Sequence, residues 1–126
     1  MKSTLPFTDL LNLPSMTICT AAPPAIPHAA SVYFVADDHL SLYFLSATSS
    51  QHVRDLALNP LAAVTIEPLV ERWQEIRGLQ MRGSAAEIPN GFQSAAGWAL
   101  TFLLTTVSTN WSFPWPWTRR AATGIV

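Results

Sequence analysis

Residues 30–66 constrain the fold more than any other stretch, because short β-type runs and polar breaks alternate along it. Residues 31–35 and 40–45 are rich in β-branched, aromatic and aliphatic side chains, and a polar triplet at 37–39 separates them. A break of this length between two such runs predicts an antiparallel hairpin. His39, within the break, is best explained as a solvated turn residue.

The second run alternates between two kinds of position. Leu40, Leu42 and Phe44 share one face of a strand, because side chains two residues apart point the same way. The positions between them share the other face. We expect the first face to meet a hydrophobic core and the second to meet a ligand or a partner subunit.

A short helix is predicted at residues 51–58, because its apolar residues recur at helical spacing and Asn59-Pro60 then ends the pattern. A hydroxyl-rich run at 46–50 leads into this helix. The residues expected on its buried face are Val53, Leu56 and Ala57.

The start of this helix is a candidate anion site. Ser49 or Ser50 is the expected N-cap, and the free N–H groups and dipole of a helix start favour a small anion such as phosphate. An ordinary helix cap explains the same residues equally well. His52, in the first turn, is either a surface histidine or a contact to such an anion, since the dipole disfavours an unpaired imidazolium there.

The remaining elements are predicted from apolar runs and their breaks. We expect a helix within residues 7–13 and strands at 16–20, 26–35 and 61–66. Residues 75–88 should form a long strand or strand pair, bent at Gly78 and Gly83. The expected core residues there are Leu79, Met81 and Ala85, with Gln80 and Arg82 on the other face.

Composition narrows the class of protein. A chain of 126 residues predicts a single domain, residues 1–126. Only 12% of residues are charged, against about 25% in typical soluble domains, which favours a sizeable core and a buried partner surface. A formal net charge of −1 argues against nucleic-acid binding. The lone Cys19, in an apolar setting, predicts a packed thiol in a reducing compartment, and with no recognisable secretory signal we expect a cytoplasmic protein.

The region from residue 88 to residue 118 carries no charge, and residues 95–107 are strongly apolar. A membrane anchor would need roughly 18 to 20 apolar residues, and this run is shorter and diluted by threonines. The pattern favours a buried helix that begins near Asn90-Gly91 over a membrane span. The residues on its buried face would be Ala95, Trp98, Ala99, Phe102 and Leu103.

The order of these motifs resembles the pyridoxamine 5'-phosphate oxidase-like superfamily of FMN-binding split barrels. The likeness covers residues 17–88, and its motifs read LYFLS, SSQH, NPLAAVTI and IRGLQMRGSAAEI. It is most similar to a small uncharacterised bacterial subgroup that has a histidine at the position of His52 and a G-x-Q-x-x-G strand. This resemblance implies a mainly β fold with short helices, a six-stranded antiparallel split β-barrel. It also implies a homodimer that binds FMN at the subunit interface.

The resemblance assigns roles to individual residues. Backbone groups of one strand would lie along the isoalloxazine edge, and these residues are Ala30, Ser31, Val32, Tyr33 and Phe34. Leu45 and Ser46 would follow at the end of the next strand, Ser50, Gln51 and His52 would bind the phosphate, and Gln80 would face the cofactor.

The chain also departs from the oxidase. Where the oxidase places basic residues near the phosphate, this chain has Ala30, Gln51 and His52, and the oxidase's Arg-x-His substrate motif is absent. The resemblance therefore implies an FMN-dependent oxidoreductase acting on an unknown small molecule rather than on pyridoxine phosphate. The alternative is a non-catalytic dimeric module that binds flavin or haem. We find no nucleophile motif and no metal-ligand spacing that would assign a catalytic or metal-binding residue.

Overall fold

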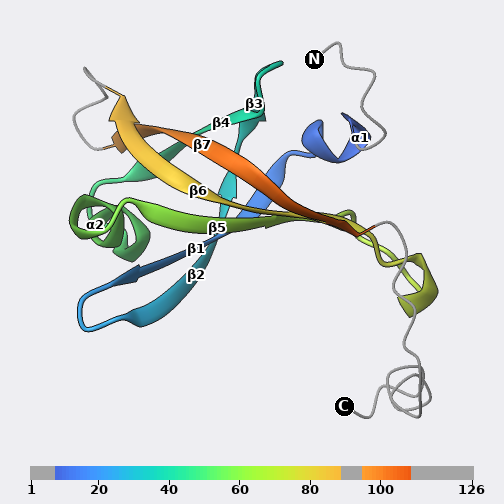
Figure 1. The fold of residues 1–126 in the computed structure, drawn as a ribbon, viewed down its shortest axis with the longest axis horizontal. Helices are drawn as coiled ribbons and strands as arrows, with labels where there is room; N and C mark the ends of the chain where they lie inside the picture. Colours follow the sequence, from blue (N-terminus) through green and yellow to red (C-terminus); the bar gives the residue numbers. More distant parts are fainter. Residues whose placement is uncertain (1–7, 89–94, 109–126) are drawn as a thin grey trace.

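The chain folds into one strongly curved antiparallel sheet with two short α-helices beside it (Figure 1). The computed structural model describes residues 8–88 and 95–108. Its strands are β1 (Ser15–Ala22), β2 (Ile26–Tyr33), β3 (Val35–Ala36), β4 (Ser41–Ala47), β5 (Leu61–Ile66), β6 (Gly78–Ile88) and β7 (Ala95–Ser108). Its helices are α1 (Thr8–Leu11), α2 (Gln51–Leu58) and a single 3-10 turn, η1 (Trp73–Glu75).

The order of strands across the sheet is β2-β1-β5-β6-β7-β4-β3. Its two edge strands, β2 and β3, are separated in the chain by Phe34 alone, so the sheet must curl until its edges meet. Within the described ranges no ladder joins β2 to β4, and the barrel is therefore split rather than closed. If β2 and β3 are counted as one interrupted strand, the seven segments make six strands, which is the number that the resemblance implies.

The core lies inside the curl and follows the period of two expected for strands. On β4, Leu42 and Phe44 are buried while Leu45 is exposed, as the alternation predicts. On β6 the predicted core residues Leu79, Met81 and Ala85 are likewise buried. Burying a leucine or methionine side chain fully contributes about 1.5–3 kcal/mol, so these positions supply much of the driving force.

The predicted hairpin is confirmed at its turn but is much shorter than expected. Only β3 pairs with β4, through Val35 with Tyr43 and Ala36 with Leu42. Residues 31–33 pair instead with β1, and this ladder ends where the Phe34 N–H donates to the Pro14 carbonyl at 3.1 Å. The run therefore changes partners at Phe34, which periodicity within one segment cannot indicate.

One carboxylate holds the β3–β4 turn together. Asp37 accepts hydrogen bonds from the backbone N–H groups of His39 and Ser41 and from the Tyr43 hydroxyl, each at 2.9 Å. These bonds, first of all the one from Ser41, lower the pKa of Asp37. His39 is exposed, as predicted for a solvated turn residue.

The long strand β6 begins at Gly78, where an added Cβ would lie 3.0 Å from the Ile66 carbonyl oxygen. Its irregularity falls between Gln80 and Met81, opposite β7, and not at Gly83 as expected. A close backbone approach explains the first glycine of the G-x-Q-x-x-G motif.

The helix predicted to begin near residue 90 is wrong. Residues 95–108 form β7, which pairs with β6 on one side and with β4 on the other. Without β7 both neighbours would expose unpaired backbone groups, so the hydrogen bonds of two strands outweigh a helical spacing of apolar residues. None of the helices in ranges 8–88 and 95–108 has the length and apolar character needed to cross a membrane. The tail after Asn110, which differs from the last strand that the resemblance implies, lies outside the described residues.

Candidate functional site

Helix α2 packs beside β1 and β2, and its first turn faces the end of β4 (Figure 1). Its bounds, Gln51–Leu58, are those predicted. The buried face differs, because Val53 and Leu56 are buried as expected but Ala57 is exposed, and His52 and Asp55 are buried in its place. Two of the four buried side chains on this helix are therefore polar, which is unusual unless each is hydrogen-bonded.

Ser50 occupies the N-cap position of α2 without capping it. Its backbone is extended, and its hydroxyl donates to the Ala47 carbonyl at 2.7 Å rather than accepting from the helix. The hydroxyl thus ties the preceding loop together. The N-cap side chain leaves the first N–H groups of α2 open to another acceptor.

His52 joins the predicted phosphate residues into a cluster. Its side chain is only 7% exposed, and its Nε2 lies 2.6 Å from the Ser46 Oγ and 3.5 Å from the Ser50 Oγ. The ring also packs against Phe44, with centroids 6.2 Å apart. Burial, and then the charge of His28, lower the pKa of His52, while Asp55 acts in the opposite direction. The imidazole is therefore neutral at neutral pH.

His28 is a member of this cluster that sequence reasoning missed. It projects from β2, and its ring stacks on that of His52 with centroids 6.3 Å apart and planes 10° from parallel. His28 shares the inward-facing positions of β2 with Ala30 and Val32. The alternation of β2 could have placed His28 on the inward face of the strand, but only the packing of α2 against β2 brings the two rings together.

Asp55 anchors α2 to the sheet. Its carboxylate is 3% exposed and accepts hydrogen bonds from the Gln51 Nε2 and the Thr20 Oγ1, each at 2.8 Å. These bonds, first the one from Gln51, lower the pKa of Asp55. The Gln51 Oε1 accepts from the Arg54 Nη2 at 2.9 Å. The Gln51 amide is thus engaged with Asp55 and Arg54, and not with Ser46 and Ser50.

A hollow of about 560 Å³ opens beside the histidine pair. Its polar lining comes from His28, Gln51, Arg54 and Asp55, and the rest is apolar. Space for a small ligand group therefore lies next to His28, while His52, Ser46 and Ser50 are not among the residues that line this hollow.

The predicted ring-binding residues on β2 divide between its two faces. Val32 and Phe34 are buried in the core and Ala30 is half-buried, while Ser31 and Tyr33 point outward. Within the described part of the chain β2 has only β1 as a strand neighbour, so backbone groups on its other edge carry no ladder. This arrangement suits contacts through the backbone, as the sequence predicts. Leu45, at the end of β4, is 57% exposed.

Gln80 does not join the group formed by His28, Ser46, Ser50 and His52 at the start of α2, which we call the α2 cluster. It lies on β6 between Thr65 and Thr106 in the ladder, and it lines a separate hollow of about 510 Å³ on the outer face of the sheet. Cys19 lies on the same face and is exposed, so the packed thiol predicted from its apolar neighbours is wrong. Side chains alternate along β1, and because Ile18 and Thr20 on either side of Cys19 both point inward, Cys19 points outward.

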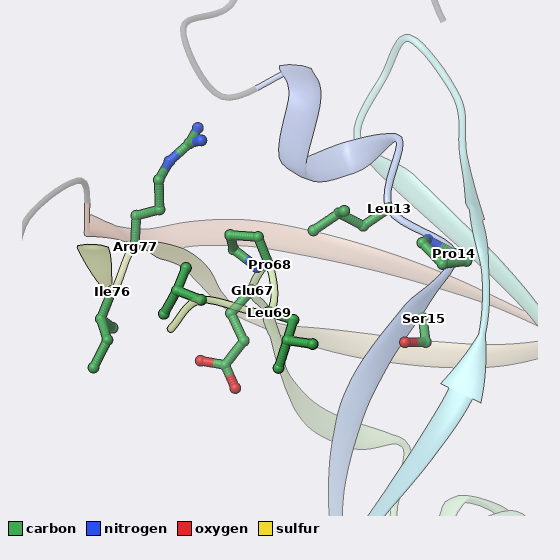
Figure 2. Close-up of a pocket in the computed structure, with 9 residues that line it drawn as sticks. Leu13, Pro14, Ser15, Glu67, Pro68, Leu69, Ile76 and Arg77 are labelled. Carbon is green, nitrogen blue, oxygen red and sulfur yellow. The ribbon is translucent and has the colours of Figure 1, made fainter. Parts of the chain in front are cut away.

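A further hollow, of about 600 Å³, lies beside α1 (Figure 2). Its labelled lining is mainly apolar, and Arg77 reaches out toward α1, where its Nη2 pairs with the Asp9 carboxylate at 2.7 Å. It gathers fewer groups for recognition than the α2 cluster does. Among the described residues, no group of three or more His, Cys, Asp and Glu side chains could hold a metal ion.

The sequence matches no family model and no curated protein. Solved structures do match. HutZ, the haem storage protein from Vibrio cholerae, gives a TM-score of 0.75 at 12% identity over 87% of this chain and 97% of its own. A candidate pyridoxamine 5'-phosphate oxidase from Listeria innocua gives 0.66 at 15% identity over 80% and 93%. General stress protein 26 from Bacillus anthracis gives 0.63 at 15% identity over 76% and 85%. The split β-barrel expected from the sequence is confirmed.

Proposed function

We propose that this chain, which has the split β-barrel fold of the pyridoxamine 5'-phosphate oxidase-like proteins, binds FMN beside helix α2 and acts as an oxidoreductase on a small molecule. The ligand's phosphate would lie against Ser46, Ser50 and His52. The ring would lie along the free edge of β2. Bound FMN would supply the electron transfer, and the protein would supply binding and orientation.

One observation carries the proposal, namely that three residues from the end of β4 and the start of α2 converge. The Nε2 of His52 is within 3.5 Å of both serine hydroxyls. In the structure the Ser50 hydroxyl donates to the Ala47 carbonyl, and His52 and Ser46 are hydrogen-bonded to each other. If these bonds were exchanged for bonds to the ligand, the two hydroxyls and the imidazole could each donate to a phosphate oxygen, and the helix start would add backbone N–H groups and a favourable dipole. The donor set therefore fits a phosphate group.

The charge of the site differs from that of a phosphate site built on fixed cations. Arg54, the basic residue of α2, is hydrogen-bonded to Gln51, and the Asp55 carboxylate lies one turn along the helix from the site. The Arg54 guanidinium lies beside the Asp55 carboxylate in the lining of the hollow, so further positive charge at the cluster must come from the helix dipole and from protonation of an imidazole. We expect FMN to bind more weakly here than at an arginine- or lysine-based site.

The proposal includes a homodimer. Gln80 lies on the outer face of β6, away from the α2 cluster of its own chain. It could meet a cofactor bound at α2 only if a second copy packed against that cluster. The apolar side chains exposed near the free edge of the sheet, Tyr33 at 80% and Val35 at 66%, would lie in such an interface. The free thiol of Cys19 suits a reducing compartment, so we place the dimer in the cytoplasm.

A second candidate is a non-catalytic module that binds haem. Two observations favour it, the stacked pair His28 and His52 and the likeness to HutZ, a haem storage protein. A neutral imidazole is a common axial ligand of haem iron, and the lowered pKa of His52 keeps it neutral. In this case the hollow beside His28 would receive part of the macrocycle.

The visible absorption spectrum of the purified protein distinguishes the two candidates. Flavin and haem have different bands, and an apoprotein can be titrated with FMN while flavin fluorescence is followed. If FMN binds as proposed, His52→Ala should weaken binding at least tenfold, which corresponds to losing one hydrogen bond to a charged group. His39→Ala, at the exposed turn, is the matched control and should bind like wild type. Absence of any quenching by excess FMN would rule out the flavin proposal.

A further inference from the structure

We propose that His28 and His52 act together as a proton-dependent anion receptor, so that binding of the ligand's phosphate is accompanied by uptake of a proton by the imidazole pair. The inference rests on the proposed function in one respect, that the anion is the phosphate of the ligand. It adds His28 as a recognition residue, and it predicts how affinity depends on pH.

The geometry sets the two rings apart from an ordinary surface pair. They come from different elements, β2 and α2, and their planes are nearly parallel with centroids 6.3 Å apart. The side chain of His28 has no hydrogen-bond partner among residues 8–88 and 95–108, and it lines the hollow beside α2. Its ring nitrogens are therefore free to meet a ligand.

The groups around the pair offset only part of the charge that it gains on protonation. His52 contacts the Ser46 and Ser50 hydroxyls and the Phe44 ring, all of which are neutral. From α2 itself, Asp55 is the nearest acid. Its oxygens accept from the neutral Gln51 amide and the neutral Thr20 hydroxyl of β1, so the carboxylate keeps its negative charge and attracts a proton on either ring.

Arg54 is the other charged group on this part of α2, and it donates to the Gln51 amide. Two imidazolium rings at this spacing would repel each other, and this repulsion opposes the protonated form of His52 in the ligand-free protein. The pair therefore has room to take up a proton when a negative charge arrives.

A doubly charged anion next to the rings reverses this preference for the less protonated form. Burial and the charge of His28 lower the pKa of His52, and both effects oppose the protonated form. An anion next to the pair favours that form, so the pKa of His52 rises on binding. Between the lower, free value and the higher, bound value, one proton is taken up for each anion bound. Affinity must then fall as pH rises, by up to tenfold per pH unit.

Sulfate is the appropriate probe, because it keeps two charges across the range of interest whereas phosphate itself titrates near pH 6. We would titrate the histidine-labelled protein with sodium sulfate at pH 5.5, 6.5 and 7.5 and follow the imidazole signals by NMR. The expected result is weaker binding at pH 7.5 than at pH 6.5, by up to tenfold, with an upward move in the His52 titration midpoint. Signals of His28 should shift with those of His52, while those of His39 should not.

The matched variants are His28→Phe, which keeps a stacked ring without a charge, and His39→Phe at the exposed turn. We expect His28→Phe to bind sulfate more weakly at pH 5.5 and to lose most of the pH dependence, and His39→Phe to behave like wild type. The wild-type titration needs no variant, so a misfolded His28→Phe would leave the test intact.

The outcomes separate this inference from the proposed function. Sulfate binding that does not change with pH, or a His52 midpoint that sulfate does not move, would overturn the proton-coupled receptor even if FMN binds. Proton-coupled sulfate binding by a protein that does not bind FMN would support the anion receptor and would refute the proposal that the ligand is FMN.

Discussion

Replacing Thr20 with valine tests whether the buried carboxylate of Asp55 anchors α2 to the sheet. Both side chains are 3% exposed, and the Thr20 hydroxyl donates to the Asp55 Oδ2 at 2.8 Å. Valine has nearly the same shape, so Thr20→Val removes the donor without opening a cavity. A hydrogen bond to a charged group is worth about 1.5–3 kcal/mol, and the added buried methyl group returns about 0.8 kcal/mol. The expected net loss of stability is about 1–2 kcal/mol.

The loss should depend on pH. Hydrogen bonds from Gln51 first and from Thr20 second lower the pKa of Asp55 below its ordinary value in an unfolded chain, about 3.9. A group with a lowered pKa stabilises the fold fully above the unfolded value, and this contribution is lost as pH falls through the folded value. The difference between wild type and Thr20→Val should therefore be complete at pH 7 and should shrink below about pH 4.

Urea denaturation followed by tryptophan fluorescence measures both effects. With a denaturant dependence of about 2 kcal/mol per molar urea, the midpoint at pH 7 should fall by roughly 0.5–1 M. Thr17→Val, on the outward face of the same strand, is the control and should move stability by no more than about 0.5 kcal/mol. If Thr20→Val is no less stable than Thr17→Val at pH 7, the anchoring role assigned to Asp55 is wrong.

Two further pairs of substitutions test the packing of β6 and β7. Leu79→Ala removes a side chain with no exposure and should cost about 2–5 kcal/mol in thermal or urea unfolding, whereas Leu69→Ala, at a fully exposed position, should be close to neutral. Gly78→Ala places a Cβ 3.0 Å from the Ile66 carbonyl oxygen and should cost about 1–3 kcal/mol, while Gly97→Ala, whose nearest neighbours would be side-chain atoms at 3.5 Å, should cost less. Equal effects within either pair would contradict the packing described.

Local patterns predict most of the elements. Helix α2 and strand β5 have the bounds expected from the sequence, and the buried positions of β6 follow its alternation. These features depend on neighbours in the chain, which the sequence displays directly. The partner change at Phe34 and the conversion of residues 95–108 into β7 depend on contacts between distant segments, and periodicity carries no information about those.

The candidate site shows the same division. Ser46, Ser50 and His52 lie close along the chain, and the structure brings their side chains into contact. Gln51, between two of them, turns toward Asp55 because a buried carboxylate needs donors. His28 is far from His52 in sequence, and only the docking of α2 against β2 reveals it.

The position of β7 in the sheet bears on the order in which the chain can fold as it is synthesised. β7 is the only link between the four-strand segment β2-β1-β5-β6 and the pair β4-β3 in the described ladder. Strand β4 is made early, yet its main partner, β7, is the last to leave the ribosome among the strands of residues 8–88 and 95–108. Until residue 108 has emerged, a finished sheet of four strands would coexist with an unpaired β4, whose open edge is a natural binding site for chaperones and for aggregation.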